Sequence, residues 1–300
     1  MILKFPSINT YHLVVFYFVA THKNISTAAE ELCLTQPTVT KHIKNLENNL
    51  DMKLIEVKRK RVVLTSAGEG LYLYAREIYS QAIAAERYIE HMKYSNVNIG
   101  VSPLFVSAIS KAINTLTDKL HSSVKINIKF GSHMDLIEDV IDLKLDLAIV
   151  PDLGYGQDKV SNTRIADAVK LMFFASPAHV IFKKAKIQWK DLCNYPLLVG
   201  HEPFATKKVI PDKMIAEGVH TPLNMDLTAN NIECCKILVR NGKNISVCLK
   251  EDIERELNDG TLRIIPLPNP VTVEVEAVAH RGLLTSPIIQ SIISCMKASF

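Results

Sequence analysis

The 300-residue sequence has no long apolar run and no pattern of a secretion signal. The apolar stretch near its start, residues 13–20, is far shorter than the ~20 residues that span a bilayer. Thr21, His22, Lys23 and Asn24 follow it, where a signal peptide has small residues before its cleavage site. We therefore expect a cytoplasmic protein that does not interact with a membrane.

Regular cysteine patterns and catalytic motifs are also missing. The sequence contains no GxSxG, HExxH, P-loop or dinucleotide-binding motif. No CxxC pair occurs, and buried reduced thiols explain the irregular spacing better than a metal site or a disulfide framework. We expect no metal, no cofactor and no enzymatic activity. The six cysteines are Cys33, Cys193, Cys234, Cys235, Cys248 and Cys295.

Charge is small in total but unevenly distributed. The chain has 35 Lys and Arg against 31 Asp and Glu. Residues 1–65 hold nine basic and five acidic side chains, whereas the two kinds are equal in number over residues 66–300. Because the length exceeds the ~100–200 residues of one domain, we expect a basic module attached to a neutral body. The basic module predicts an anionic partner at that end only.

Helix signals follow one another closely in the basic module. Residues 11–21 are densely apolar and predict a buried helix. Thr27 and Glu30 have the spacing of a capping box, which predicts a second helix over about 27–32. Thr35 can cap a third helix. This third helix has one apolar stripe, formed by Val39, Ile43, Leu46 and Leu50.

Two short helices, the second with a polar and basic free face, predict a helix-turn-helix. A basic run at residues 58–61 lies between apolar runs at 54–55 and 62–64, which predicts a β-hairpin wing. Such a wing tip suits the phosphate backbone of DNA. A solvated loop or a solvent-facing helix would explain either feature alone. Their ordered succession favours DNA binding.

Ser26-Thr27-Ala28-Ala29, the run Thr35-Gln36-Pro37-Thr38-Val39-Thr40, Leu46-Glu47, Leu64-Thr65 and Ala67-Gly68 together resemble the signature of LysR-type transcriptional regulators. The resemblance covers about the first 70 residues. Val57 stands where the family has a wing arginine, and we expect Lys58 and Arg59 to replace that contact. The residues that the resemblance implies to contact DNA are Thr35, Gln36, Pro37, Thr38, Thr40, Lys41, Lys44, Lys58 and Arg59.

Residues 66–93 predict one long helix, because they contain no proline and have glycine only at positions 68 and 70. Apolar residues recur at alternating spacings of four and three, which is a heptad seam. Such a stripe could pack on its own domain, but the small winged module leaves little to cover it. The resemblance implies a dimerisation helix at this place. The predicted seam is Leu71, Ala75, Ile78, Ala82, Ala85 and Ile89.

From residue 97 on, predicted strands alternate with predicted helices, which favours a parallel or mixed α/β sheet with helices on both faces. Strands are expected at 97–101, 124–130, 147–150, 169–175, 197–199, 223–227, 245–249 and 273–279. Helices are expected at 103–120, 134–143, 206–217, 230–241, 250–258 and 286–298.

Two serines follow predicted strands at the positions where ligands of such sheets bind. Ser102 precedes Pro103 at a helix start, and Ser132 can form a capping box with Asp135. Capping alone would explain both serines. Hydroxyls and free amides at helix starts also suit a carboxylate or a similar anion.

Residues 187–198 and 239–247 resemble the periplasmic-binding-protein-like effector domain of the same family. The resemblance implies a winged helix-turn-helix at 1–65, a linker and dimerisation helix at 66–95, and a two-subdomain α/β effector domain at 96–300. Subdomain I is expected at about 96–165 and 268–300, and subdomain II at about 166–267. The implied effector positions are Ser102, Ser132, Pro151, His201, Phe204, Thr206 and Ile245.

We therefore interpret the chain as a LysR-type DNA-binding regulator, a homodimer or homotetramer on double-stranded promoter DNA, which senses a small anionic effector. Two alternatives are an enzyme and a solute-binding protein, each with an appended DNA-binding module. The missing catalytic motifs argue against the first alternative. Residues 1–93 and the missing export signal argue against the second.

Overall fold

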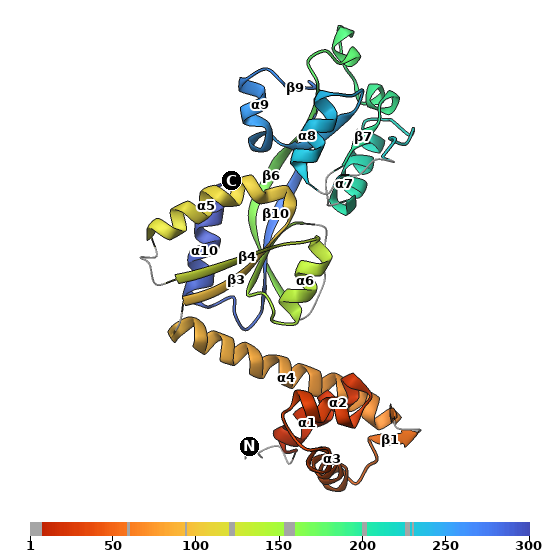
Figure 1. Cartoon of the computed structure of the whole chain (residues 1–300), viewed down its shortest axis with the longest axis vertical. Coiled ribbons are helices and arrows are strands. Elements are labelled where there is room, and N and C mark those ends of the chain that lie inside the picture. The colour runs from red at the N-terminus through yellow and green to blue at the C-terminus, as the bar shows by residue number, and fades with distance from the viewer. Residues whose placement is uncertain are drawn as a thin grey trace. The chain divides into compact units, whose positions relative to one another are not determined.

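The computed structural model describes residues 8–58, 61–93, 95–119, 124–152, 160–199, 203–225, 229 and 231–300. It divides into two compact units, Met1–Glu86 and Arg87–Phe300 (Figure 1). No helix in these described ranges is both long and apolar enough to cross a membrane.

Three helices form the core of the first unit. The third helix starts as predicted, since the Thr35 hydroxyl accepts a hydrogen bond from the Thr38 amide. Its apolar stripe packs against Phe16 and Val19 of the first helix, which are fully buried. The helices are α1 (Thr10–His22), α2 (Ile25–Glu31) and α3 (Gln36–Leu50).

The second helix begins two residues earlier than the predicted capping box allows. Asn24 is its N-cap, and the Asn24 side chain accepts hydrogen bonds from the amides of Ser26 (2.8 Å) and Thr27 (3.4 Å). The prediction that Thr27 and Glu30 form the cap is therefore wrong. The asparagine already satisfies the first free amides of the helix, so nothing is left for Thr27 to cap.

A buried carboxylate ties the wing to α3. Glu47 accepts hydrogen bonds from the amides of Leu54 (2.9 Å) and Ile55 (3.3 Å), and it pairs with Lys53 Nζ at 2.7 Å. Burial acts to raise the pKa of Glu47, but the hydrogen bonds and the charge of Lys53 outweigh it and hold that pKa below its usual value. The wing itself is a two-stranded antiparallel sheet of β1 (Ile55–Lys58) and β2 (Arg61–Leu64), and residues 59–60 of its tip lie outside the described residues.

The predicted long helix leaves the wing through a close contact at Gly68. This helix is α4 (Ser66–Lys93). The Thr65 hydroxyl donates to the Lys53 carbonyl (2.7 Å) and accepts from the Gly68 amide (3.0 Å). A Cβ at Gly68 would lie 2.1 Å from the Leu54 carbonyl oxygen. Only glycine therefore lets the first turn of α4 approach the backbone before the wing.

One mixed sheet runs through the second unit, in the order β4-β3-β5-β10-β6-β8-β7, with β9 paired to β6. The strands β3, β4 and β5 are parallel, whereas β10 is antiparallel to both β5 and β6. The strands are β3 (Ser95–Val101), β4 (Val124–Phe130), β5 (Leu147–Pro151), β6 (Val160–Ala175), β7 (Leu197–Leu198), β8 (Ile245–Leu249), β9 (Arg263–Ile264) and β10 (Val271–His280).

The long strands β6 and β10 run through two halves of this unit (Figure 1), which we call lobe I and lobe II. Lobe I holds β3, β4 and β5, and lobe II holds β7, β8 and β9. In lobe I, α5 and α10 cover one face of the sheet and α6 covers the other. The helices of lobe I are α5 (Val106–Lys119), α6 (His133–Ile141) and α10 (Pro287–Lys297). The 3-10 turn η1 (Pro103–Phe105) directly precedes α5. Those of lobe II are α7 (Pro203–Ala216), α8 (Ile232–Arg240) and α9 (Glu254–Asn258), the last preceded by η4 (Lys250–Ile253).

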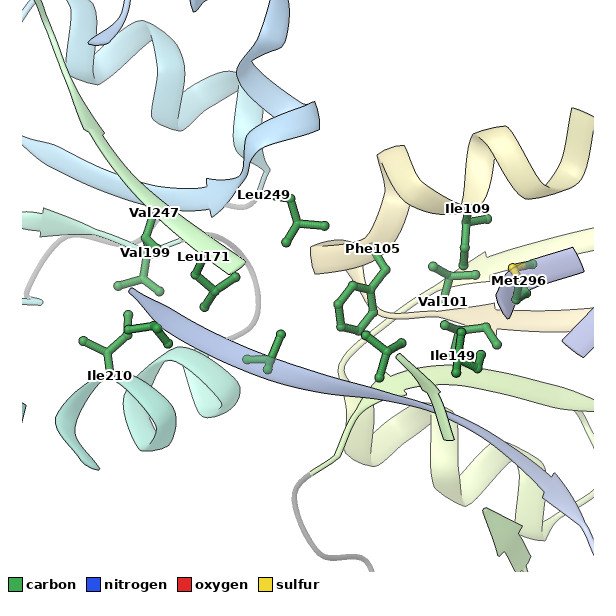
Figure 2. Close-up of a cluster of buried hydrophobic side chains, with 14 of the residues drawn as sticks. Val101, Phe105, Ile109, Ile149, Leu171, Val199, Ile210, Val247, Leu249 and Met296 are labelled. Atoms are coloured by element: carbon green, nitrogen blue, oxygen red, sulfur yellow. The ribbon is translucent and has the colours of Figure 1, made fainter. Parts of the chain in front are cut away.

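One buried hydrophobic core extends through both lobes. Figure 2 shows Phe105, from η1, on the side of the lobe I cluster nearest Leu249 of lobe II. Both side chains are about fully buried. A change in the angle between the lobes must therefore repack this contact. The other labelled members are Val101, Ile109, Ile149 and Met296 in lobe I and Leu171, Val199, Ile210 and Val247 in lobe II.

The predicted alternation of strands and helices is confirmed, with different lengths in places. The strand expected at 169–175 is only the second half of β6. At 223–227, the described residues form an isolated bridge between Asn224 and Pro196, and residues 226–228 lie outside the described part. The helix expected at 250–258 is divided into η4 and α9.

All six cysteines are free, but they are not all buried as predicted. Cys235, Cys248 and Cys295 are buried, whereas Cys33 is exposed. Burial raises the pKa of Cys248 well above its usual value, so this thiol stays protonated and unreactive at neutral pH.

We expect Glu47→Gln to lower the free energy of unfolding of the winged unit by about 1–3 kcal/mol, the usual cost of weakening a buried charge-assisted hydrogen-bond set. Because the pKa of Glu47 is lowered by folding, its contribution is present above the pKa of the unfolded chain and is lost as the pH falls through the folded-state pKa. The difference between variant and wild type should therefore shrink in acid.

Amide hydrogen exchange over residues 36–64 of the full chain measures this stability. Glu56→Gln is the matched control, since Glu56 is exposed and its partner among the described residues is Lys58 on the wing. An equal effect of the two substitutions would show that the contacts of Glu47 do not hold the wing.

Candidate DNA-binding and effector-binding sites

One face of α3 forms a hollow of about 560 Å³ that is lined mostly by polar residues. Among the described residues, neither Lys41 nor Lys44 pairs with an acidic side chain, so both ammonium groups are available to an anion. Asn48 lies one turn beyond Lys44 on this face and was not predicted as a contact; its spacing of four from Lys44 is the signal that could have found it. The hollow is lined by Gln36, Pro37, Thr40, Lys41, Lys44, Asn45 and Asn48.

Hydroxyl groups shape the start of this face. Thr35 and Thr38 share a 2.8 Å hydrogen bond between their hydroxyls, and the Thr40 hydroxyl donates to the Gln36 carbonyl (2.9 Å). Ser26 of α2 donates to Gln36 Oε1 at 3.3 Å, which orients the amide of Gln36. The threonines thus order the helix start, while Gln36 and the lysines extend outward.

The wing lies next to the start of α3. A second hollow is lined by Asn24, Ile25, Ser26, Gln36, Val57 and Val62, so α2, α3 and both wing strands meet there. Lys58 is exposed and pairs with Glu56 at 2.6 Å. Arg59 lies outside the described residues. Val57 is 60% exposed, so its side chain is not part of the hydrophobic core and instead lines this hollow at the surface.

The predicted seam of α4 divides into two parts. Ala75 is fully buried in the core of its own winged unit, and Leu71 packs against that core. Ile78 and Ile89 are 40% and 50% exposed, and Ala82 and Ala85 are exposed as well. The first turns of the stripe therefore pack on the core of the winged unit, and the stripe is exposed to solvent from Ile78 onward.

The two candidate serines stand at the ends of neighbouring parallel strands. Ser102 follows β3 and is fully buried, and its amide donates to the Ile149 carbonyl (2.9 Å). Ser132 follows β4 and is half-buried; its hydroxyl accepts from the Asp135 amide (3.3 Å) and donates to the Asp135 carboxylate (2.8 Å). Both residues are N-caps, of η1 and α6 respectively. Pro151 ends β5 and is buried.

The remaining effector candidates come from lobe II. Ile245 is buried at the first position of β8, opposite Leu197, whereas the last residue of that strand, Leu249, lies toward lobe I. Phe204 and Thr206 belong to α7, and the placement of their side chains is not described. His201 lies outside the described residues.

A hydrogen bond joins the lobes at the start of α5. The Ser107 hydroxyl donates to the Asp252 carboxylate, which also accepts from the Leu249 amide at 3.2 Å. Burial raises the pKa of Asp252, although both hydrogen bonds favour its charged form. Next to this contact lies a cavity of about 500 Å³ whose lining includes Ala108, Lys111, Lys170, Lys250 and Phe300. It includes none of the effector positions predicted from the sequence.

A winged helix-turn-helix with a free basic face, followed by a two-lobed α/β domain, defines a DNA-binding regulator with a ligand-binding domain. Residues 10–69 match the sequence profile described as "Bacterial regulatory helix-turn-helix protein, lysR family". Residues 95–300 match the LysR substrate binding domain. The chain belongs to the LysR family of transcriptional regulators.

Individual relatives agree with this assignment over most of their length. The chain is 28% identical over 266 residues to a probable RuBisCO transcriptional regulator of Thalassiosira pseudonana, covering 86% of each chain. It is 27% identical over 271 residues to the regulator CfxR of Cupriavidus necator, covering 89% of this chain and 84% of the relative. A full-length OxyR variant of Pseudomonas aeruginosa has the same fold, with a TM-score of 0.64 at 19% identity over 97% of this chain and 98% of its own.

We expect Lys44→Ala to weaken binding to duplex DNA about equally for specific and unrelated sequences, and to lower the slope of log affinity against log salt by about one. The physical reason is the loss of one unpaired ammonium group from the exposed face of α3. Fluorescence anisotropy at several salt concentrations, with the DNA upstream of the protein's own gene, measures both quantities. Lys213→Ala, which removes a lysine paired with Glu217 in lobe II, is the control. A salt slope unchanged by Lys44→Ala would exclude Lys44 from the phosphate contacts.

Proposed function

We propose that this LysR-family regulator binds promoter DNA as a homodimer or homotetramer and senses a small anion between the lobes of its second unit. The proposed domain limits are 1–65 for DNA binding, 66–95 for the linker and dimerisation helix, and 96–300 for effector binding. Subdomain I comprises about 96–165 and 268–300, and subdomain II about 166–267. The observation that carries the effector proposal is the pair of serine caps at the ends of the adjacent parallel strands β3 and β4.

The DNA interface consists of the predicted residues of α3 and the wing. Direct contacts to bases are assigned to Gln36, Thr40 and Lys41, whose face of α3 is open and polar. Lys44, Lys58 and Arg59 are assigned to phosphates. Thr35, Pro37 and Thr38 form the start of the helix and fix its orientation. Arg61, at the foot of the wing tip, adds another exposed cation.

The dimer interface is formed by the exposed part of the α4 stripe. Ile78, Ala82, Ala85 and Ile89 follow heptad spacing on one face, and exposed apolar side chains at this spacing are stabilised by a second helix. Tyr74, 70% exposed, extends this face by one turn toward the winged unit. Small alanines at two of the positions favour a close approach of the two helices.

The effector site is assigned to the carboxyl ends of β3, β4 and β5. Ser132 is its accessible member in this conformation, and Ser102 becomes accessible when the lobes move apart. Backbone amides at the starts of η1 and α6 supply donors to a negative group. Pro151 adds an apolar wall, and His201, Phe204 and Thr206 are assigned to the side contributed by lobe II. Ile245 is buried at the end of β8 opposite to Leu249 and lies away from that side. A small carboxylate or inorganic oxyanion fits this chemistry.

The chain acts in the cytoplasm as a regulator and not as an enzyme. The relatives found by sequence are transcriptional regulators, which supports this proposal. Among the described residues, no group of three or more His, Cys, Asp or Glu side chains has the arrangement of a metal site.

A thermal-shift screen of small carboxylates, sulfur oxyanions and aromatic acids tests the effector proposal. A ligand at 100 times its Kd should stabilise the protein by about 2.7 kcal/mol. Loss of a hydrogen bond to a charged ligand in Ser132→Ala should weaken Kd by about 10- to 100-fold.

Lys170→Glu, in the cavity beside Asp252, is the matched control and should leave that affinity unchanged. If Lys170→Glu removed the shift and Ser132→Ala did not, the anion would bind in that other cavity and the effector assignment would be wrong.

Ile78→Asp should convert the dimer to monomers in sedimentation velocity, because a carboxylate in the seam would lose its water without gaining a partner. Leu73→Asp is the control: Leu73 is 57% exposed but lies on a different face of α4. A dimer that survives Ile78→Asp but not Leu73→Asp would move the interface to the other face.

A further inference from the structure

The last two turns of α4 are docked on lobe I by two side chains, Arg87 and His91. These residues are four apart, so they lie on one face of the helix. Arg87 donates to the carbonyl of Leu143 at 3.4 Å, and it also lies 3.6 Å from the carboxylate of Glu90. His91 Nε2 lies 3.4 Å from Asp146 Oδ1. Both acceptors belong to the loop between α6 and β5.

The pair His91–Asp146 is deeply buried. Each side chain is about 1% exposed, which is rare for two ionisable groups unless they are paired. Asp146 is fixed by its own backbone and side chain: its carboxylate accepts from the Asn98 amide (2.7 Å), and its amide donates to the Asn98 carbonyl (2.9 Å). Removing either side chain would leave the other buried and without this neighbour.

The contact between His91 and Asp146 is close but lacks hydrogen-bond geometry. Neither ring nitrogen of His91 has a hydrogen-bond partner among the described residues, and the same holds for Asp146 Oδ1. A small shift of the loop would therefore bring His91 and Asp146 into a hydrogen bond or separate them. Such a pair is sensitive to the position of the strand to which Asp146 is attached.

Two strands connect this pair to the proposed effector site. Asn98 lies in β3, which ends immediately before Ser102, and Asp146 immediately precedes β5, which ends at Pro151. The two strands are parallel neighbours, with Ile99 opposite Leu147 and Val101 opposite Ile149. At ~3.3 Å per residue, five residues of strand separate the two ends by roughly 15 Å.

We propose that His91 and Asp146, supported by Arg87, form a latch that makes the end of the linker helix a rigid extension of lobe I. Through this latch, a change at the effector end of β3 and β5 repositions the DNA-binding modules. His91, Asp146 and Arg87 are positioning residues, which contact neither DNA nor effector. The latch is independent of ligand identity, but its role in signalling rests on the function proposed above.

The test uses the full-length protein with Asp146→Asn, His91→Gln and the double variant. Asparagine keeps an acceptor for the Asn98 amide and removes only the charge. We expect amide exchange over residues 87–93 to accelerate by about tenfold or more in each single variant, with no further acceleration in the double variant. Exchange over residues 36–50 should not change. Glu86→Gln, an exposed residue of α4 outside the latch, is the control and should behave as wild type.

The second readout is the footprint on DNA from the protein's own upstream region. We expect the latch variants to bind each half-site with affinity within about twofold of wild type, because the winged unit is unaltered, but to change the length of DNA protected between half-sites. Arg87→Ala, which buries no unpaired charge, should give the same change in milder form and keeps the test informative if Asp146→Asn unfolds lobe I.

Unchanged exchange over residues 87–93 in all variants would overturn the latch. Faster exchange with an unchanged footprint would overturn its role in positioning the DNA-binding modules. Failure of every anion to bind in the thermal-shift screen would instead contradict the proposed effector class, and it would leave the exchange and footprint results standing on their own.

Discussion

The antiparallel pairing of β6 with β10 is the contact on which the second unit depends. It extends from Val160 to Leu171 on one strand and from Val271 to His280 on the other, and the two lobes share no longer stretch of paired backbone among the described strands. Its register shifts twice, between Val273 and Val275 and between Val275 and Glu276. Such irregularities bend a strand pair and weaken its local hydrogen bonding. The pair therefore bends most easily between the lobes, where a binding domain that opens and closes needs flexibility.

Bending at this pair is opposed by contacts beside it. Ser107 and Asp252 join the lobes by a hydrogen bond, and Phe105 packs toward Leu249 in the common core. Burial raises the pKa of Asp252, while the hydrogen bonds from the Ser107 hydroxyl and the Leu249 amide act to lower it. Opening the lobes would break one of these hydrogen bonds but would also return Asp252 to water. The two effects on Asp252 oppose each other, so the hydrogen bond alone does not set the cost of separating the lobes.

Local signals predicted most of the elements but not the contacts between them. Buried strands such as 147–150 and the capped third helix were predicted correctly, because their residues carry the pattern in themselves. Thr27 failed as a cap because Asn24 competes for the same amides. The role of Glu47 was missed, since it depends on the amides of Leu54 and Ile55, which meet it only after the chain turns at Asp51. Asp51 adopts a left-handed backbone, φ 50°, at the end of α3, a conformation that the sequence there does not indicate.

Contacts across long sequence distances left no local signal at all. His91 and Asp146 are 55 residues apart, and each alone is an ordinary polar residue at the end of an element. Likewise, the heptad spacing of α4 is the same for residues that pack within the winged unit, Leu71 and Ala75, and for the exposed residues that begin at Ile78. The spacing alone therefore did not separate the two groups. The distinction depends on where α2, α3 and the wing end in space. The Gly68 contact with Leu54 sets that position, because it fixes where α4 leaves the wing.

The placement of the latch determines which lobe controls the DNA-binding modules. Within the described residues, Arg87 and His91 both contact the loop that joins α6 to β5, and this loop belongs to lobe I. If the proposed latch holds, closure of the lobes about β6 and β10 would move lobe II relative to lobe I and the end of α4 together. In a dimer held together by α4, closure can change the spacing of the winged modules only if lobe II is itself restrained by another subunit.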